Sequence, residues 1–486
     1  MTAPDPALLA RLADLLGPKG YTDDGEMMAP WLSDWRGRVH GRAAAMLSPA
    51  STNEVQEIVR LCAKAGVQLT VQGGNSGQCA GATPDGSGEA LLLSLRRMNR
   101  IREVNASARL LKGDAGVILV HAHDAAEEVG LRFPLTLGGK GSATLGGLVS
   151  TNAGGTQVLR HGTMRALTAG LEVVLPDGSL LDLMTPLAKD NQGPDPKQIF
   201  IGAEGTLGIV TGVTLKLVPA VAARAVGWFT VASPHMALRA LRRMEGPLGD
   251  ALEGFEIVPQ VALTNVVEHI PGTRAPVETA GPWHVLVELV AHAGEDDPTP
   301  RLETALADLI ETGIASDATI AASEAQAEAF WRIRDAISEA ERAIGPAIQH
   351  DISVPVDRMP DYIAAVPNKV AVDLPGATCL AFGHLGDGNV HFHIRPPSSS
   401  DAEAWIAANG EQASRIAYAE AVAMGGSISA EHGIGRVKRS MLAELGDPAR
   451  LAILRATKAA LDPAKLLNPG VLVPDASLLA TAPRAQ

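Results

Sequence analysis

Glycine is concentrated in three short segments of this 486-residue chain, and these segments restrict its fold more than any other feature. Residues 73–77 read GGNSG, residues 138–155 read GGKGSATLGGLVSTNAGG, and residues 201–209 read IGAEGTLGI. Because glycine has no Cβ atom, its backbone can approach another group closely and can adopt positive φ angles. Loops of this composition present backbone N–H groups that suit a pyrophosphate or a flat aromatic ring. The three segments therefore predict a bound dinucleotide.

The usual sequence fingerprints of nucleotide-binding loops are missing. Neither G-x-G-x-x-G nor G-x-x-x-x-G-K-[ST] occurs in the chain, which argues against a Rossmann fold and against a P-loop. One such loop alone, for example residues 73–77, could equally be a tight turn without a ligand. Three of them between residues 73 and 209 favour a ligand.

Composition excludes several classes of partner. The 41 Lys and Arg against 54 Asp and Glu give a formal net charge of −13, which opposes binding to nucleic acid or to anionic membranes. No apolar run approaches the length of about 20 residues that spans a bilayer, and the N-terminus lacks the basic region of an export signal. Cys62, Cys79 and Cys379 lie too far apart for a disulfide framework or a thiolate metal site. We expect a protein of a reducing compartment, the cytoplasm.

Local patterns predict helices and strands in both halves of the chain. Leu8, Leu12, Leu15 and Leu16 have helical spacing, and Ser51 with Glu54 forms a capping box that starts a helix ending near residue 66. In the first half, strands are expected over 67–72, 91–95, 171–175, 180–183 and 210–217. In the second half, we expect strands over 226–231 and 284–290, helices over 234–245, 300–312 and 323–343, and two strands flanking a turn at 386–389. This order predicts an α+β protein of two or three domains.

Two histidines and a glutamate offer a set of metal ligands. His384 and His391 flank the turn Gly-Asp-Gly-Asn, so a hairpin can bring both imidazoles to one side. With the carboxylate of Glu431 they would form a His₂Glu set, which leaves coordination positions open for catalysis. For each histidine alone, a hydrogen-bonded core residue is the better interpretation, but the clustering with the Gly-Asp-Gly-Asn turn and Glu431-His432-Gly433 favours the metal site. Arg334 and Ser338 lie four residues apart on the long expected helix, where a guanidinium and a hydroxyl could hold a carboxylate, or simply face solvent.

The glycine-rich strings, QGGNSGQCAGA (72–82), PLTLGGKGSATLGGLVSTNAGG (134–155) and FIGAEGTLGIVTGVTLKL (200–217), resemble the FAD-binding domain of the vanillyl-alcohol-oxidase-type flavoproteins. The segment Asp34-Trp35-Arg36-Gly37 resembles their D-2-hydroxyacid dehydrogenase branch. The resemblance implies an α+β fold: an N-terminal helix (1–30), a two-lobed FAD-binding domain (31–221), a substrate domain with an antiparallel sheet (222–425) and a C-terminal helical segment (426–486).

By this resemblance the chain binds FAD through loop residues. The attachment is expected to be non-covalent, because Asn75 and Ser76 stand where some relatives carry a histidyl linkage. The implied FAD-binding residues are Gly73, Gly74, Asn75, Ser76, Gly77, Gln78, Thr144, Gly146, Gly147, Thr151, Asn152, Gly205, Ile209 and Asn468.

The same resemblance implies the reaction and its residues. A zinc or similar divalent ion would be held by His384, His391 and Glu431, and His432 would remove the hydroxyl proton while a hydride passes from the substrate to flavin N5. The product would be a 2-oxo acid. The implied substrate-binding residues are Arg334, Ser338, Gln349 and His393.

Two positions depart from the pattern of dicarboxylate-using members of the branch. Gln349 stands where a lysine is usual, and His393 stands where an asparagine is usual. Losing a positive charge weakens the argument for a second substrate carboxylate. D-2-hydroxyglutarate, D-malate, D-lactate and a larger apolar D-2-hydroxy acid all remain open.

The electron acceptor is not visible in the sequence. The resemblance implies electron-transfer flavoprotein, with a quinone-linked partner, a complex subunit or oxygen as alternatives, and a homodimer is possible. Two other functions stay open at this point. A zinc hydrolase could use His384, His391 and Glu431 to activate water, and a non-catalytic nucleotide-binding subunit could dispense with them.

Overall fold

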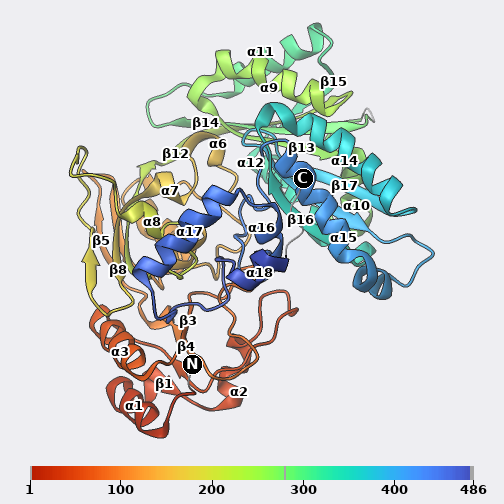
Figure 1. Ribbon diagram of the computed structural model, residues 1–486. Helices are drawn as coiled ribbons and strands as arrows, with labels where there is room; N and C mark the ends of the chain where they lie inside the picture. Colours follow the sequence, from red (N-terminus) through yellow and green to blue (C-terminus); the bar gives the residue numbers. More distant parts are fainter. Residues whose placement is uncertain (1–2, 279–280, 482–486) are drawn as a thin grey trace. The chain divides into compact units, whose positions relative to one another are not determined.

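The computed structural model describes residues 3–278 and 281–481, and within them the chain forms two compact units (Figure 1). The first unit contains the residues up to Gly155, the segment His161–Pro219 and the residues from Glu431 on. The second unit contains Thr156–Arg160 and Ala220–Ala430. The C-terminal helical segment expected over 426–486 therefore belongs, from Glu431 on, to the first unit.

The first unit is built on three sheets. In the first sheet, β2, β4 and β3 run parallel and β1 is antiparallel at the edge, whereas the other two sheets are antiparallel. In order across each sheet, the strands are β1 (Tyr21–Thr22), β2 (Met46–Leu47), β4 (Leu91–Ser94) and β3 (Leu69–Gln72); β5 (Ile101–Asn105), β6 (Leu110–Asp114), β10 (Ile209–Lys216), β8 (Thr168–Val174) and β9 (Leu180–Asp182); and β11 (Val218–Pro219) with β7 (Leu131–Arg132).

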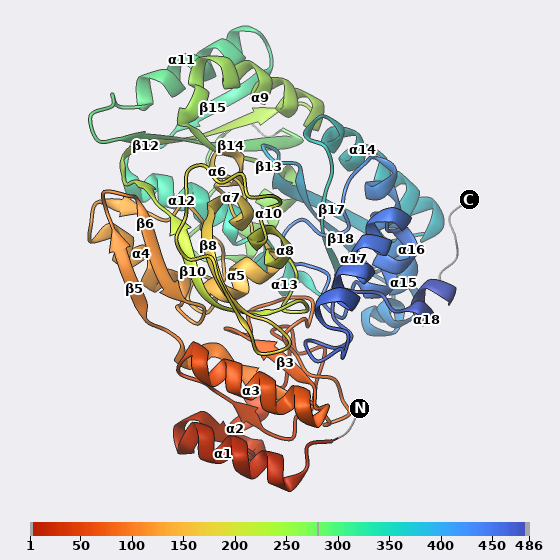
Figure 2. The same ribbon diagram turned by 60° about the vertical axis from the view of Figure 1, so that its left-hand side comes forward.

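The helix after Ser51 begins and ends at the positions that the sequence indicates. The Ser51 hydroxyl accepts a hydrogen bond from the Glu54 N–H (3.3 Å), and Gly66 ends the helix at φ +68°. Leu8, Leu12 and Leu16 are buried, and α1 lies beside α3 (Figure 2). The helices are α1 (Pro6–Gly20), α2 (Gly25–Met28), η1 (Ala29–Trp31), α3 (Thr52–Ala65), η2 (Leu95–Arg97), α4 (Leu119–Glu127), α5 (Leu145–Thr151), α7 (Met164–Leu167), α8 (Lys197–Phe200), α16 (Arg439–Leu445), α17 (Pro448–Leu461) and α18 (Ala476–Thr481); α6 (Val158–His161) crosses the boundary between the two units.

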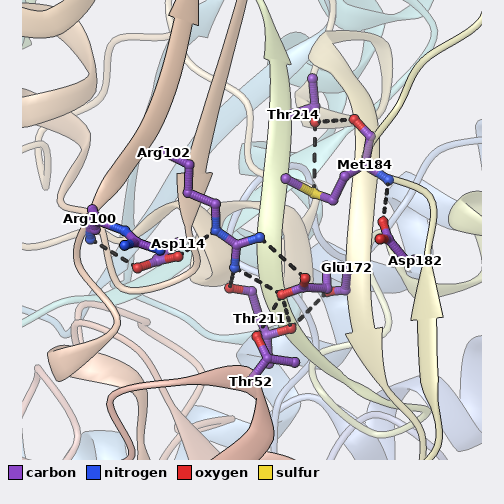
Figure 3. A network of polar contacts seen from close by, with 9 residues as sticks. All are labelled: Thr52, Arg100, Arg102, Asp114, Glu172, Asp182, Met184, Thr211 and Thr214. Carbon is purple, nitrogen blue, oxygen red and sulfur yellow. Dashed lines mark hydrogen bonds and ion pairs between the residues drawn. The ribbon is translucent and has the colours of Figure 1, made fainter.

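A cluster of charged and hydroxyl groups links β5, β6, β10 and β8 of the five-stranded sheet (Figure 3). The Arg102 guanidinium donates from Nε to Asp114 Oδ1 (2.6 Å) and from Nη2 to Glu172 Oε1 (2.9 Å). Glu172 also accepts hydrogen bonds from the hydroxyls of Thr52 (2.7 Å) and Thr211 (2.8 Å). Burial alone would raise the pKa of Glu172, but the bonds from Arg102 and the two threonines outweigh it and hold that pKa below its usual value.

The second unit contains one antiparallel sheet of seven strands. The two strands that carry His384 and His391 form the hairpin that the Gly-Asp-Gly-Asn turn predicts, with His384 opposite Asn389. In order across the sheet, the strands are β15 (Ala315–Ile320), β12 (Val221–Val231), β14 (Trp283–His292), β13 (Leu252–Pro259), β17 (Thr378–His384), β18 (Asn389–Arg395) and β16 (Ile348–Ser353).

Helices cover both faces of this sheet. One face packs Trp228, Leu286 and Phe382 against α10, α12 and α13, and we call it the histidine face because His384 and His391 lie beside Phe382 on it. The opposite face, which carries Phe229 and Phe392, packs against the other helices. The helices of the unit are α9 (Pro234–Leu248), η3 (Gly249–Ala251), α10 (Gln260–His269), α11 (Thr299–Glu311), α12 (Glu324–Asp335), α13 (Ile337–Ile344), η4 (Val356–Arg358), α14 (Met359–Asp373) and α15 (Ala402–Ala423).

The prediction of a single long helix over 323–343 is wrong, because two helices cover this range. Ser323 caps its start as expected, but α12 ends at Asp335 and α13 begins at Ile337. Ala336, between them, has ψ −6° and is both the C-cap of α12 and the N-cap of α13. Arg334 and Ser338 therefore belong to two different helices.

A buried histidine in this unit makes stability depend on pH. His284 on β14 lies between the Thr230 hydroxyl (3.2 Å from Nδ1) and Gln260 Oε1 (2.9 Å from Nε2), and burial lowers its pKa to about 4. Since unfolded histidine has a pKa of about 6.5, unfolding takes up a proton between these values. Stability from the neutral ring is complete above about pH 6.5 and falls as the pH decreases, by about 3 kcal/mol at pH 4.

The measurement is urea unfolding at several pH values, followed by tryptophan fluorescence, since the Trp228 ring lies 6.0 Å from the His284 ring. His284→Gln should remove most of the loss of stability between about pH 6.5 and pH 4. The exposed His235, replaced by Gln, should leave it unchanged. Identical pH profiles for wild type and His284→Gln would contradict the prediction.

Candidate active site

The loop after β3 presents unused backbone donors in the first unit. Among the described residues, none accepts a hydrogen bond from the backbone N–H groups of residues 73–77. Asn75 has φ +53°, and its side-chain amide donates to Ser33 O (2.8 Å), which fixes the loop. A Cβ atom on Gly77 would meet nothing within 4 Å, so this end of the loop is open. Such a row of N–H groups is suited to an anionic phosphate.

The backbone of this loop packs closely against the second glycine segment. A Cβ on Gly74 would lie 1.7 Å from Ser142 O, and one on Gly73 would lie 2.3 Å from Thr144 Oγ1. The buried Thr144 hydroxyl has no hydrogen-bond partner within the described part of the chain. Buried polar atoms nearly always have partners, so this hydroxyl is available to bond to a group bound beside the two loops. The two glycines are therefore required for close packing beside a ligand site.

A pocket of about 340 Å³ opens next to Gly74 and Asn75. It is lined by Pro30, Trp31, Ser33, Asp34, Trp35, Gly74 and Asn75, and the Trp35 side chain is 60% exposed. The volume lies within the range of small-molecule and cofactor sites. The segment around Asp34 thus stands beside the loop that the resemblance assigns to FAD.

The other predicted FAD residues are adjacent to these loops, and several use their side chains internally. Gly146 packs on Ala115, where a Cβ would lie 2.6 Å from the Ala115 Cβ. The Thr151 hydroxyl donates to Gly147 O (3.1 Å). Asn152, at φ +51°, accepts from the Thr163 hydroxyl (3.0 Å) and the Arg165 N–H (2.9 Å).

Asn468 joins the third glycine segment to the first. Its side chain accepts from the Val71 N–H (2.6 Å) and donates to Glu204 O (2.6 Å). Gly205, next along the chain, has φ +69° and packs on the Asn468 amide, and Ile209 is fully buried at the start of β10. The glycine segments therefore converge in one unit, and the open donors, the orphaned Thr144 hydroxyl and the pocket fit a bound FAD.

The histidine face of the second unit brings two of the predicted metal ligands together. The rings of His384 on β17 and His391 on β18 are 5.5 Å apart. His384 Nδ1 lies 3.5 Å from Asp387 Oδ2, and His391 Nδ1 lies 3.9 Å from Asp351 Oδ1. A carboxylate next to each Nδ1 favours the tautomer with the proton there, which leaves Nε2 as the acceptor or ligand atom.

Both Nε2 atoms point toward a buried ion pair. The Arg334 guanidinium donates to Glu256 Oε2 (2.8 Å), with side-chain exposures of 11% and 2%. His384 Nε2 lies 3.9 Å from Glu256 Oε1, and His391 Nε2 lies 3.5 Å from Arg334 Nη2. The predicted carboxylate-binding arginine is therefore beside both histidines.

The remaining predicted substrate residues lie in different surroundings. His393 faces Glu341 (3.5 Å), which also pairs with Arg395 (2.8 Å). Gln349 on β16 stands opposite His393 in the sheet, whereas Ser338 is the second residue of α13. Burial would raise the pKa of Glu341, but the bonds from His393 and Arg395 hold it below its usual value.

Glu431 and His432 belong to the first unit, so the predicted ligand set draws on both units. The residues that follow them are held by Glu204, whose carboxyl oxygens accept hydrogen bonds from the N–H groups of Ile434 and Gly435 (2.8 Å each). Burial raises the pKa of the Glu204 carboxyl, although these two bonds and the Lys438 ammonium act in the opposite direction. The joint binding of one ion by His384, His391 and Glu431 stays a prediction.

Sequence reasoning did not find four acidic residues that line these sites: Glu204, Glu256, Glu341 and Asp351. Each is less than a tenth exposed. A buried carboxylate within an apolar strand is unusual without a partner, so Glu256 in the string LEGFEIVP offered a signal.

Comparison with known proteins gives the same assignment over nearly the whole chain. A family model described as "FAD binding domain" matches residues 43–184, and one described as "FAD linked oxidases, C-terminal domain" matches residues 221–472. The chain is 34% identical over 467 residues to the mitochondrial D-2-hydroxyglutarate dehydrogenase of Bos taurus, covering 96% of this chain and 83% of the relative. It is 36% identical over 439 residues to the D-2-hydroxyglutarate dehydrogenase of Xanthomonas citri pv. viticola, covering 90% and 91%.

The expected cytoplasmic location is wrong. The relatives from Bos taurus, Arabidopsis thaliana and Rattus norvegicus are each named as mitochondrial, although the Xanthomonas relative is bacterial. The three cysteines are free thiols, and free thiols do not distinguish one reducing compartment from another. Among the described residues, no helix combines the length and apolar character needed to cross a bilayer.

Solved structures agree on the fold. The match to p-cresol methylhydroxylase with bound substrate has a TM-score of 0.73 at 15% identity and covers 97% of both chains. An α+β architecture with an FAD-binding domain and an antiparallel substrate-side sheet is thereby confirmed. From its loops, its two matched domains and its relatives, the chain belongs to the FAD-linked D-2-hydroxyacid dehydrogenases, oxidoreductases that act on the CH–OH group of D-2-hydroxy acids.

Proposed function

We propose that this enzyme oxidises a D-2-hydroxy acid to the 2-oxo acid with the help of a divalent metal ion, with His432 as the base. The observation that carries the proposal is the arrangement of His384 and His391, whose rings are 5.5 Å apart and whose Nε2 atoms face the buried Arg334–Glu256 pair. Two imidazoles with carboxylates behind their Nδ1 atoms are a usual feature of metal sites. His384 and His391 would hold the ion, and Glu431 would be a third ligand.

Bound FAD supplies a hydride acceptor, and the metal ion would supply a Lewis acid that acidifies the substrate hydroxyl. The residues of the chain supply the rest. The Arg334 guanidinium would bind and orient the substrate carboxylate, while its pairing with Glu256 keeps the arginine in place. His432 would take the hydroxyl proton as the Cα–H bond breaks, since an imidazole is close to neutral at physiological pH.

The metal assignment is tested by elemental analysis of the purified protein. Wild type should contain one divalent ion per bound FAD, and His384→Ala and His391→Ala should lose the ion but keep the FAD. His350→Asn is a matched control, because His350 is a buried histidine on β16 that bonds to Ser414 and Phe392 O on the opposite face. Wild-type metal content in both His384→Ala and His391→Ala would overturn the proposed site.

Substrate class depends on charge near Gln349. Near Gln349, the Arg395 guanidinium is already paired with the Glu341 carboxylate, which leaves it less available to a second substrate carboxylate. Gln349→Lys should raise kcat/KM for D-2-hydroxyglutarate relative to D-lactate by about tenfold, the effect of one charge-assisted hydrogen bond. Gln349→Glu should shift the same ratio in the opposite direction. Equal ratios in all three proteins would contradict a role for this position in substrate choice.

We also infer that the reduced flavin passes its electrons to electron-transfer flavoprotein or another carrier, as the family resemblance implies. A homodimer is a further expectation from the same source. Anaerobic mixing of substrate-reduced enzyme with oxidised electron-transfer flavoprotein tests the first inference: reoxidation of the enzyme supports it, and a flavin that stays reduced opposes it.

A further inference from the structure

Glu204 connects three parts of the first unit, and neither the sequence motifs nor the resemblance gives it a role. Glu204 is 9% exposed. Its carboxyl group lies against the segment that follows His432. Oε1 accepts from the Ile434 N–H and Oε2 accepts from the Gly435 N–H, both at 2.8 Å. A Cβ on Gly433 would lie 2.9 Å from Oε1, so the carboxyl packs directly on the residue after His432.

Cys79 holds the same segment at other atoms. Its thiol donates to Gly433 O (3.3 Å), and its carbonyl accepts from the Arg436 N–H (2.9 Å). Gly435 has φ +54°, and a Cβ there would lie 1.9 Å from Cys79 O. Cys79 directly follows the FAD loop at residues 73–78. The segment 433–436 is therefore held by Glu204 and Cys79, each of which lies in or next to a loop that the resemblance assigns to FAD.

The backbone of Glu204 is itself held in an uncommon conformation. Its φ is +50°, which is rare for a residue other than glycine. Its N–H donates to Ser150 O in α5 (2.8 Å), and its carbonyl accepts from the Asn468 amide (2.6 Å). Conformations of this kind are strained and persist only where the surrounding structure holds them. In this conformation the Glu204 carboxyl reaches the segment after His432.

We propose that Glu204 is a positioning residue, which fixes the backbone after His432 and thereby sets the place of the imidazole relative to the FAD-binding loops. This inference rests on the proposed role of His432 as the base. A carboxyl group is required because two N–H donors converge on it and each needs an acceptor oxygen. A glutamine has one acceptor, and its NH₂ group would face the second N–H.

The test is stopped-flow reduction of bound FAD under anaerobic conditions, with D-2-hydroxyglutarate and D-lactate as the probes. Glu204→Gln should lower the reduction rate constant by about tenfold to a hundredfold, because small displacements of a reacting group have effects of this size. The amplitude per bound FAD and the FAD content should stay at wild-type values. A partly unfolded enzyme would instead lose amplitude and keep its rate constant. Glu172→Gln, which removes another buried carboxylate of this unit, should keep the wild-type rate constant.

A double variant shows whether Glu204 acts through His432. If it does, Glu204→Gln should slow His432→Asn by less than twofold, since groups that act as one unit are not additive. Full additivity, loss of FAD or a wild-type rate in Glu204→Gln would each overturn the inference. If Glu204→Gln does not fold, Cys79→Ala takes its place, and it should slow reduction severalfold in the wild type but not in His432→Asn. A wild-type rate in His432→Asn would instead contradict the proposed role of His432 as the base. The failure of the proposed function is thereby distinguished from the failure of the inference on Glu204.

Discussion

His432→Asn is expected to slow the reduction of bound FAD by a D-2-hydroxy acid by about a thousandfold, within the usual range for loss of a general base. Asparagine keeps a polar side chain of similar reach but cannot take up a proton. The segment that carries it should keep its place, because Glu204 and Cys79 bind backbone atoms of residues 433–436. The measurement is anaerobic stopped-flow absorbance at the flavin band, normalised to bound FAD.

A control variant makes this prediction specific. His235→Asn, which changes an exposed histidine, should reduce FAD at the wild-type rate. A decrease of less than about tenfold would be too small for a base and would contradict the assignment.

Arg102→Ala is expected to destabilise the first unit by about 3 kcal/mol, because it leaves two largely buried carboxylates without their cation. Asp114 and Glu172 are 9% and 12% exposed in their side chains, and both pair with Arg102. The effect should appear in urea unfolding followed by flavin fluorescence, which reports release of FAD from this unit. Lys112→Ala is the control, since Lys112 and Glu103 form a more exposed ion pair in the same sheet. Its expected cost is below about 1 kcal/mol.

The cost of Arg102→Ala should also depend on pH. The pKa of Glu172 is lowered in the folded protein, so its contribution is present above the pKa of an unfolded glutamate and is lost as the pH falls through the folded value. The difference between wild type and Arg102→Ala should therefore narrow on acidification below about pH 4. Equal costs for Arg102→Ala and Lys112→Ala would contradict the account of the cluster in Figure 3.

Features set by neighbouring residues could be predicted from the sequence. The capping box at Ser51, the glycine that ends the same helix and the turn between β17 and β18 each depend on a few adjacent residues. The turn predicts antiparallel pairing of its two strands, and this pairing is enough to place His384 near His391. The glycine-rich composition likewise predicts close approach of the backbone, and the contact of Gly74 with Ser142 O is the clearest example.

Features that depend on distant residues could not be predicted in this way. Glu256 pairs with Arg334, which is 78 positions away, and Glu204 bonds to Ile434, which is 230 positions away. The string that holds Glu256 signals a buried carboxylate, but its partner is not visible in the sequence. The break at Ala336 has no local signal either, because the residues on both sides favour a helix.

The most direct test of the account is the visible spectrum of the purified protein under anaerobic conditions, with D- and L-2-hydroxy acids added in turn, before and after treatment with a chelator. The account predicts bleaching of the flavin band by D-isomers alone, loss of bleaching after chelation, and recovery when zinc is restored. A flavin that no D-2-hydroxy acid reduces would contradict the proposed reaction. Bleaching that survives complete removal of metal would contradict the role proposed for His384 and His391.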